Sequence, residues 1–178
     1  MADPSTCTSL TGLSRIKLFC ALSRTPHGLL DMTTPAAAAL LWLGHFPSVE
    51  IILIGLVTTF AGYTAVYALN DVVDYRTDKE KLGHGGDRCQ EGYLDALMIR
   101  HPIAQGMLGY GEGLAWALAW GCIALIGAYL LNPVCVLIFL GGCLFEAVYC
   151  LLLKITHFRT LVSGAVKNTG AVAAVYAV

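Results

Sequence analysis

The chain has 178 residues, of which 57% are hydrophobic and only 13% are charged, and its mean hydropathy is +0.68. The charged share is about half that of an ordinary soluble domain, which excludes most soluble classes. The net charge of −1 gives no reason to expect a nucleic acid or an acidic partner. The seven cysteines form no C-x-x-C pair and no clustered Cys/His spacing. We therefore interpret them as packing residues rather than as a disulfide or zinc framework.

Residues 1–27 form a polar, Ser/Thr-rich segment that we treat as a separate N-terminal region. Its apolar patch is too short for the core of a signal peptide, so the segment is expected to stay uncleaved. Leu13 and Ile16 lie beside Arg15 and Lys17, a pattern typical of a short amphipathic turn on a membrane surface. A frayed tail explains the same residues equally well.

Long apolar runs fill most of the rest of the chain. They cover residues 32–49, 51–69, 113–131, 134–153 and 161–178, and the last two contain Glu146 and Lys167 as single charges. Each run is close to the roughly 20 residues that a helix needs to cross a bilayer. Residues 45–48 and 132–133 are turns, and the first turn predicts an antiparallel hairpin. The sequence predicts an all-α, multi-spanning transmembrane helix bundle with five helices present.

The basic residues orient this bundle. Lys and Arg occur before the first run, between the second and third, and after the fourth, and they are absent from the turns at 45–48 and 132–133. By the positive-inside rule, the N-terminus, the end of the second helix and Lys154 face the cytoplasm. We expect an integral membrane protein whose acidic motif lies on the cytoplasmic side.

That acidic motif is Asn70, Asp71, Asp74 and Asp78, directly after the second apolar run. On a helix these residues fall at about 0°, 100°, 40° and 80°, so they share roughly a quarter of the circumference. Like charges at this spacing repel one another, and hard oxygen ligands suit Mg²⁺. We predict a Mg²⁺ site; the alternative is a solvated, charged helix end at the membrane surface.

Residues 71–111 are the one long polar stretch, and polar loops of this length are usually functional. Residues 93–99 have helical spacing suited to packing over a cavity mouth. Within the apolar runs, Glu146, Lys167 and Asn168 are costly in hydrocarbon and are expected to face a bundle interior or a wet cavity. The alternative is that Lys154 and Lys167 extend to the headgroups while Glu146 pairs with a neighbour.

The cluster Asn70-Asp71-x-x-Asp74-x-x-x-Asp78 resembles the first aspartate-rich motif of the UbiA superfamily of intramembrane prenyltransferases. The segment 100–106 is similar to the Arg-Pro-x-x-x-Gly element before the third helix of those enzymes, although His101 stands in the place of the usual arginine. Tyr149 and Lys154 resemble the Tyr/Lys pair at the end of the fourth helix, with an interval of five residues instead of four. Residues 23–26 match the motif before the first helix more weakly.

The resemblance implies a bundle of nine helices with a second aspartate-rich motif after the sixth. Residues 28–178 would then be the first part of a UbiA-like domain, truncated in its fifth helix, and this fragment alone is expected to be inactive. The implied reaction moves a polyprenyl group from a prenyl diphosphate to an acceptor. That acceptor is an aromatic quinone precursor or a lipid alcohol, and the residues do not choose between them.

The resemblance also implies roles for individual residues. Mg²⁺ would be held by Asn70, Asp71, Asp74 and Asp78, and it would neutralise the leaving diphosphate. Catalytic roles would fall to Asp71, Asp74, Arg100, Tyr149 and Lys154, with Tyr149 beside the developing cation. Substrate would be bound by Arg76, Lys79, Arg100, His101, Lys154, Lys167 and Asn168. A function of a different class stays open, namely a non-enzymatic cation-binding membrane module or a transporter fragment.

Overall fold

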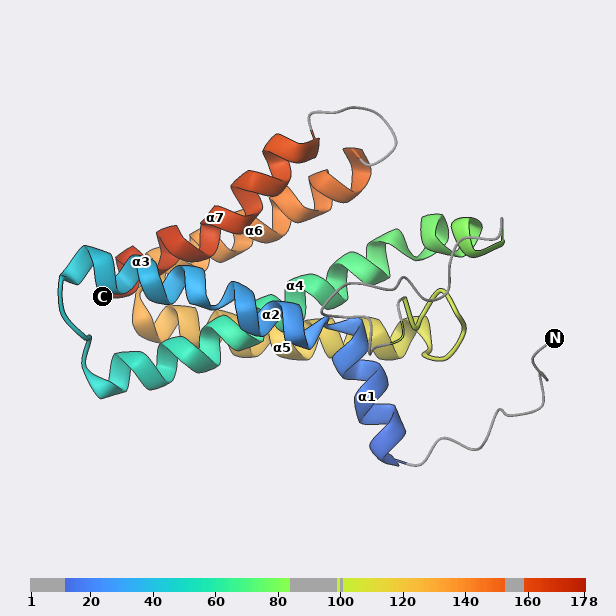
Figure 1. Ribbon diagram of the computed structural model, residues 1–178, viewed down its shortest axis with the longest axis horizontal. Helices are drawn as coiled ribbons and strands as arrows, with labels where there is room; N and C mark the ends of the chain where they lie inside the picture. Colours follow the sequence, from blue (N-terminus) through green and yellow to red (C-terminus); the bar gives the residue numbers. More distant parts are fainter. Residues whose placement is uncertain (1–11, 84–98, 100, 153–158) are drawn as a thin grey trace.

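The computed structural model describes residues 12–83, 99, 101–152 and 159–178 (Figure 1). All regular structure in these ranges is helical, which confirms the all-α prediction. The helices are α1 (Gly12–Leu22), α2 (Thr25–Asp31), α3 (Thr33–Leu43), α4 (Val49–Gly83), α5 (Tyr110–Leu131), α6 (Pro133–Leu152) and α7 (Arg159–Ala177). Among the described residues, Val49–Glu80 and Tyr110–Leu131 are long and apolar enough to cross a membrane, and Pro133–Tyr149 is a shorter apolar helix.

Helix α4 is much longer than the apolar run that predicts it. Its 35 residues span about 52 Å, whereas the hydrocarbon core of a bilayer is about 30 Å thick. No glycine or proline occurs between Tyr63 and Leu82, so nothing interrupts the helix before Gly83. The expectation that the helix ends at residue 69 and that a loop starts at residue 71 is therefore wrong. The acidic motif lies on a continuous helix that projects beyond the apolar layer.

Helices α4 and α5 lie side by side through small residues (Figure 1). The buried positions include Ala61, Ala65 and Ala68 on α4 and Ala117, Ala124 and Ala128 on α5. Because these side chains are short, the two backbones approach closely, as is common for helix pairs in membranes. This antiparallel contact fixes where the acidic end of α4 meets the beginning of α5.

The first predicted helix differs from the expectation. The run 32–49 forms only the 11 residues of α3, which ends at Gly44 in the left-handed conformation (φ 71°). Helix α3 packs mainly against α7, and not along α4 as the predicted antiparallel hairpin would require. An apolar cavity of about 320 Å³ lies among α3 to α7, with Ala39, Ile52, Ala124, Phe139 and Ala173 in its wall.

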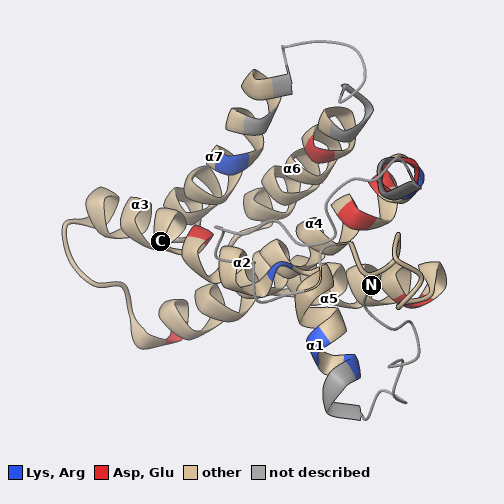
Figure 2. Ribbon diagram, turned by 45° about the vertical axis from the view of Figure 1, so that its right-hand side comes forward, with Lys and Arg blue, Asp and Glu red and all other residues tan. Residues whose placement is uncertain are grey.

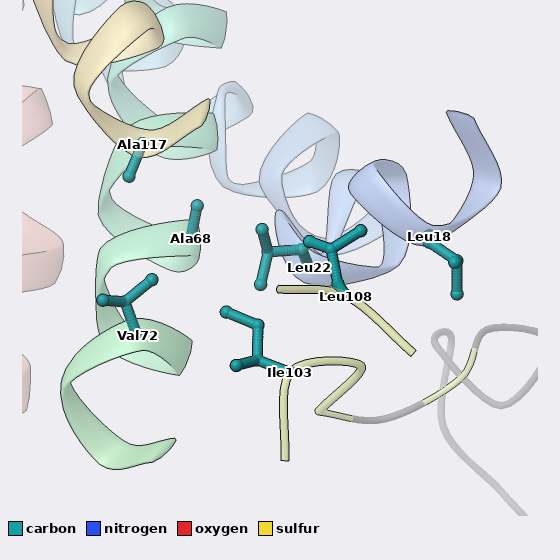
Figure 3. Packing of buried hydrophobic residues seen from close by; sticks show 7 residues of the cluster. All are labelled: Leu18, Leu22, Ala68, Val72, Ile103, Leu108 and Ala117. Carbon is teal, nitrogen blue, oxygen red and sulfur yellow. The ribbon is translucent and has the colours of Figure 1, made fainter. Parts of the chain in front are cut away.

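Helix α1 packs into the protein. Leu18 and Leu22 are 3% and 1% exposed, and they join Val72 of α4 with Ile103 and Leu108 from the segment before α5 (Figure 3). Neither a turn that rests only on the membrane surface nor a frayed tail describes this helix. The cluster ties the segment 101–108 to the last third of α4, and this position brings the segment close to the acidic motif.

Candidate functional site

The acidic face of α4 divides between two neighbours. Charged residues are sparse along most of the ribbon, and residues of both signs gather at the last turns of α4 (Figure 2). Asp71 and Asp78, two turns apart, face the segment before α5, where they contact His101. Asn70 faces α6 instead, where its amide donates a hydrogen bond to Glu146. The sequence predicts these residues as one site, but the acidic face has two edges with different partners. The first edge is Asp71 and Asp78 with His101, and the second edge is Asn70 with Glu146.

At the first edge, one imidazole contacts two buried carboxylates. His101 Nδ1 lies 2.6 Å from Asp71 Oδ1 and 2.9 Å from Asp78 Oδ2. Asp71 is 4% exposed and Asp78 is 6% exposed, so neither charge is solvated by bulk water. A buried carboxylate needs a partner of this kind, because an unpaired charge away from water is costly.

The position of His101 follows from the turn that contains it. Pro102 and Ile103 are buried, and Ile103 packs with residues of α1 and α4. The backbone folds over them through hydrogen bonds from Gln105 N to His101 O and from Leu108 N to Pro102 O. His101 itself has φ 51°, a left-handed conformation that costs a non-glycine residue about 1–2 kcal/mol. The apolar anchor and the two carboxylates hold the residue in this conformation.

The protonation of His101 follows from its surroundings. Burial alone would lower the pKa of the imidazole, but the hydrogen bonds and charges of Asp71 and Asp78 outweigh it and raise that pKa to about 9. At neutral pH the metal-free site therefore contains an imidazolium between two carboxylates. This cation neutralises one of the two negative charges.

The same three side chains offer ligand atoms for a metal ion. One atom each from Asp71, Asp78 and His101 lies within 4.8 Å of the others. Asp71 Oδ2 is buried and has no hydrogen-bond partner among the described residues. A buried carboxylate oxygen without a partner is unusual and costs free energy unless something occupies its lone pairs. The donor set thus fits a divalent cation with three further coordination positions open.

The second edge is a polar cluster between helices. Asn70 Nδ2 donates to Glu146 Oε1 over 2.8 Å, and Glu146 is only 8% exposed. The charges of Arg24, Asp74 and Lys167 lie close enough to act on Glu146, but Lys167 itself is exposed and is not enclosed as the sequence predicts. The expectation that Glu146 faces the bundle interior is confirmed by its burial. Metal ligation by Asn70 and Asp74 stays a prediction, and the structure directs Asn70 toward Glu146 of α6.

Arg24, whose charge acts on Glu146, has an unusual local structure. It precedes α2 with φ 43° and ψ 48°, again left-handed. Its two neighbours are fixed, because the Trp116 indole donates to Ser23 Oγ (2.8 Å) and Thr25 Oγ1 donates to the Cys20 carbonyl (3.1 Å). These bonds hold the segment 23–26 against α5 and the end of α1. Sequence reasoning named the segment but did not place Arg24 or Glu146 among the site residues.

The remaining predicted site residues are more scattered. Arg76 is exposed, and Lys79 is exposed with its ammonium group 5.7 Å from the ring centre of Tyr75. Tyr149 is half-buried on α6, one turn after Glu146. Asn168 is exposed and donates to the Gly164 carbonyl of its own helix, so the structure does not bring it to the cluster. Arg100 and Lys154 lie outside the described residues, as do residues 93–98 of the predicted cap over the cavity.

Comparison with known proteins identifies the family. Neither the curated proteins nor the solved structures give a match to this chain. The profile of the UbiA prenyltransferase family matches residues 32–178, which is well over half of the chain and includes both edges of the acidic face. The chain therefore belongs to the UbiA prenyltransferase family.

Proposed function

We propose that this integral membrane protein transfers a prenyl group from a prenyl diphosphate to an acceptor, with the diphosphate held at the acidic end of α4. The family indicates intramembrane prenyl transfer, and the metal dependence, the donor and the residue roles are our proposal. One observation supports it above the others. Two buried carboxylates, one with an unpartnered oxygen, stand at the end of a membrane-length helix.

The apolar cavity is placed suitably for a prenyl chain. Its wall on α4 runs from Ile51 to Val66, and the acidic motif begins at Asn70, one turn further along the same helix. A molecule with a charged head at Asp71 and Asp78 would thus direct its apolar tail into the bundle. Such a tail gains about 0.8 kcal/mol for each buried CH₂ group. The acidic end would lie at the cytoplasmic surface, as the basic residues indicate.

The chemistry requires stabilisation of the leaving group. Prenyl transfer separates an allylic cation from a diphosphate, and a divalent cation such as Mg²⁺ would neutralise the charge that develops on the diphosphate oxygens. Asp71 and Asp78 would hold that ion, with Asn70 and Asp74 as further oxygen donors. Arg76, Lys79, Arg100 and Lys154 would contact the diphosphate, and His101 and Lys167 are further candidates for substrate contacts. Asn168, which bonds to its own helix, would contact the substrate only away from the acidic end.

Two further roles complete the proposal. The face of Tyr149 would attract the developing allylic cation. The acceptor is an aromatic quinone precursor or a lipid alcohol. Its hydroxyl or ring carbon would attack the cation as the bond between the prenyl carbon and the diphosphate breaks, and the proton of that hydroxyl or ring carbon would pass to the released diphosphate or to water.

Prenyl transfer by the complete gene product in reconstituted bilayers tests the proposal. The assay follows a labelled prenyl diphosphate with each acceptor class, with Mg²⁺ and with EDTA. We expect Asp71→Asn and Asp78→Asn to lower turnover by at least about 100-fold, the usual scale for a lost electrostatic group in a catalytic site. Glu50→Gln is the matched control, since Glu50 is an exposed carboxylate at the opposite end of α4.

Two outcomes would contradict the proposal. Near-normal turnover in either aspartate variant would show that these carboxylates do not hold the reacting diphosphate. Tight binding of a divalent ion without prenyl transfer to either class of acceptor would favour the second candidate function, a non-enzymatic cation-binding membrane module. The buried carboxylates and His101 are the observation that keeps this second function in consideration.

A further inference from the structure

We infer that His101 is a direct ligand of the metal ion at Asp71 and Asp78, and that this mixed carboxylate–imidazole site binds transition dications such as Mn²⁺ and Co²⁺ more tightly than Mg²⁺. The inference rests on the proposed function for its location at the acidic motif. It goes further in naming a nitrogen ligand and a class of ion. In the resemblance that the sequence shows, residue 101 stands where a diphosphate-binding arginine is expected, whereas the structure turns His101 toward the carboxylates.

The geometry suits direct coordination. Around an octahedral ion with bonds of about 2.1 Å, adjacent ligand atoms are about 3.0 Å apart. The observed separations of 2.6 Å and 2.9 Å from His101 Nδ1 to the two carboxylate oxygens are close to this value. For these two pairs of atoms, direct coordination would need an expansion of about 0.1–0.4 Å, and the ligand atoms of all three residues lie within 4.8 Å of one another.

Burial and packing support the same assignment. Asp71 is only 4% exposed, and its Oδ2 has no hydrogen-bond partner among the described residues. This carboxylate oxygen is therefore available to bind an ion. Pro102 and Ile103 are buried immediately after His101, which limits how far the imidazole can withdraw when an ion arrives. An exposed, flexible arginine or lysine would leave freely, but this side chain is held between α4 and its own turn.

The ligand types determine which ion benefits. Carboxylate and water oxygens suit Mg²⁺ and Mn²⁺ alike, whereas imidazole nitrogen favours the transition metals, whose affinities rise from Mn²⁺ through Co²⁺ in the usual order. A nitrogen ligand therefore adds to the binding of Mn²⁺ and Co²⁺ and adds little for Mg²⁺. The alternative is that His101 serves only as a countercharge and leaves when the ion binds.

Electron spin-echo spectroscopy of Mn²⁺ bound to the complete protein distinguishes the two cases without any turnover. The protein is prepared with ¹⁴N-histidine and with ¹⁵N-histidine. A direct His101 ligand gives nitrogen modulation that changes with the isotope, and His101→Gln abolishes it. His45→Asn is the matched control, because His45 lies in the turn between α3 and α4, at the opposite end of α4 from the acidic motif. Titration calorimetry with Co²⁺ and Mg²⁺ gives the affinities.

We expect His101→Gln to weaken Co²⁺ binding by at least about tenfold, the lower end of what a lost metal-site interaction costs, and to change Mg²⁺ binding by less than about threefold. The wild-type isotope comparison stays decisive if the variant does not fold. Absence of isotope-dependent modulation in the wild type would overturn the inference, as would modulation that persists in His101→Gln. Mg²⁺-dependent prenyl transfer without histidine modulation would leave the proposed function standing and refute only this assignment. Histidine modulation without prenyl transfer would support this assignment and refute the proposed function.

Discussion

Replacing Gly127 by alanine will disturb the contact between α4 and α5 that places the acidic motif. A Cβ at position 127 would lie 2.0 Å from Thr58 Oγ1 and 3.0 Å from Thr58 Cβ, whereas ordinary contacts are 3.4–4 Å. Thr58 is β-branched, and its χ1 angle has few alternatives in a helix. The overlap at Cβ cannot be relieved by rotating the side chain, so the helices must separate or bend.

Two opposing terms set the magnitude. Alanine in place of glycine favours a helix interior by about 0.8–1 kcal/mol. Overpacking of a close contact costs about 1–3 kcal/mol, and a contact as short as this one belongs at the upper end of that range. We therefore expect Gly127→Ala to lower the unfolding free energy by about 1–2 kcal/mol. Gly55→Ala is the control, since a Cβ there meets nothing within 4 Å, and it should be neutral or stabilising.

Unfolding in mixed micelles with increasing SDS measures both variants under the same conditions. The double variant Thr58→Ala/Gly127→Ala removes the atoms of Thr58 that collide with the new Cβ. Its unfolding free energy should therefore be close to that of Thr58→Ala alone, which means that Gly127→Ala costs little once Thr58 is absent. A Gly127→Ala protein at least as stable as the Gly55→Ala protein would refute the reasoning. The gain in helix propensity would then not be reduced by any steric cost at Thr58. It would also remove the basis for the close approach of α4 and α5.

Three further predictions concern orientation, packing and charge. An impermeant thiol reagent applied to intact cells should label cysteine at position 48 and leave cysteine at position 79 unlabelled in a cysteine-free background; the reverse pattern would invert the proposed topology. Trp116→Phe removes the donor to the buried Ser23 hydroxyl and should cost about 1–2 kcal/mol in the same unfolding assay, while an unchanged value would show that the bond is not formed. In EDTA the ion pairs of His101 stabilise the fold fully below its ordinary pKa of 6.5, and this stability is lost as pH rises through about 9. Asp78→Asn should flatten that dependence, which unfolding measured from pH 6 to pH 10 would show.

The sequence was sufficient for the elements that depend on local composition. Runs of apolar residues predicted α5, α6 and α7 within three residues of their observed bounds, because a long run with at most one charge admits few alternatives in a membrane. It failed at the end of α4, where a change from apolar to charged residues was interpreted as the end of the helix. Charge does not end a helix when no glycine, proline or capping residue follows. The residues up to Lys81 are compatible with helix, and the structure continues through them.

The site was predictable only in part for a similar reason. Helical angles placed Asn70, Asp71, Asp74 and Asp78 on one face, and the face is real. Those angles cannot reveal that Asp71 and Asp78 meet His101 while Asn70 meets Glu146, because these contacts join residues 23 to 76 positions apart. The position of His101 depends on the burial of Ile103 against α1, a tertiary contact with no local signature.

The charge balance at Asp71 and Asp78 restricts how a diphosphate can enter. In the described part of the chain, the His101 imidazolium lies against Asp71 and Asp78, and one such cation balances only one of the two carboxylate charges. A diphosphate brings several more negative charges into a region where both aspartates are at least nine-tenths buried and screening by water is weak. Basic residues near the opening can attract it, but the exposed Arg76 and Lys79 are too solvated to offset a repulsion at the buried carboxylates. Under the proposed function, we therefore expect the divalent ion to be present at Asp71 and Asp78 before the diphosphate binds, or to arrive together with it, so that binding of a prenyl diphosphate depends on the concentration of that ion.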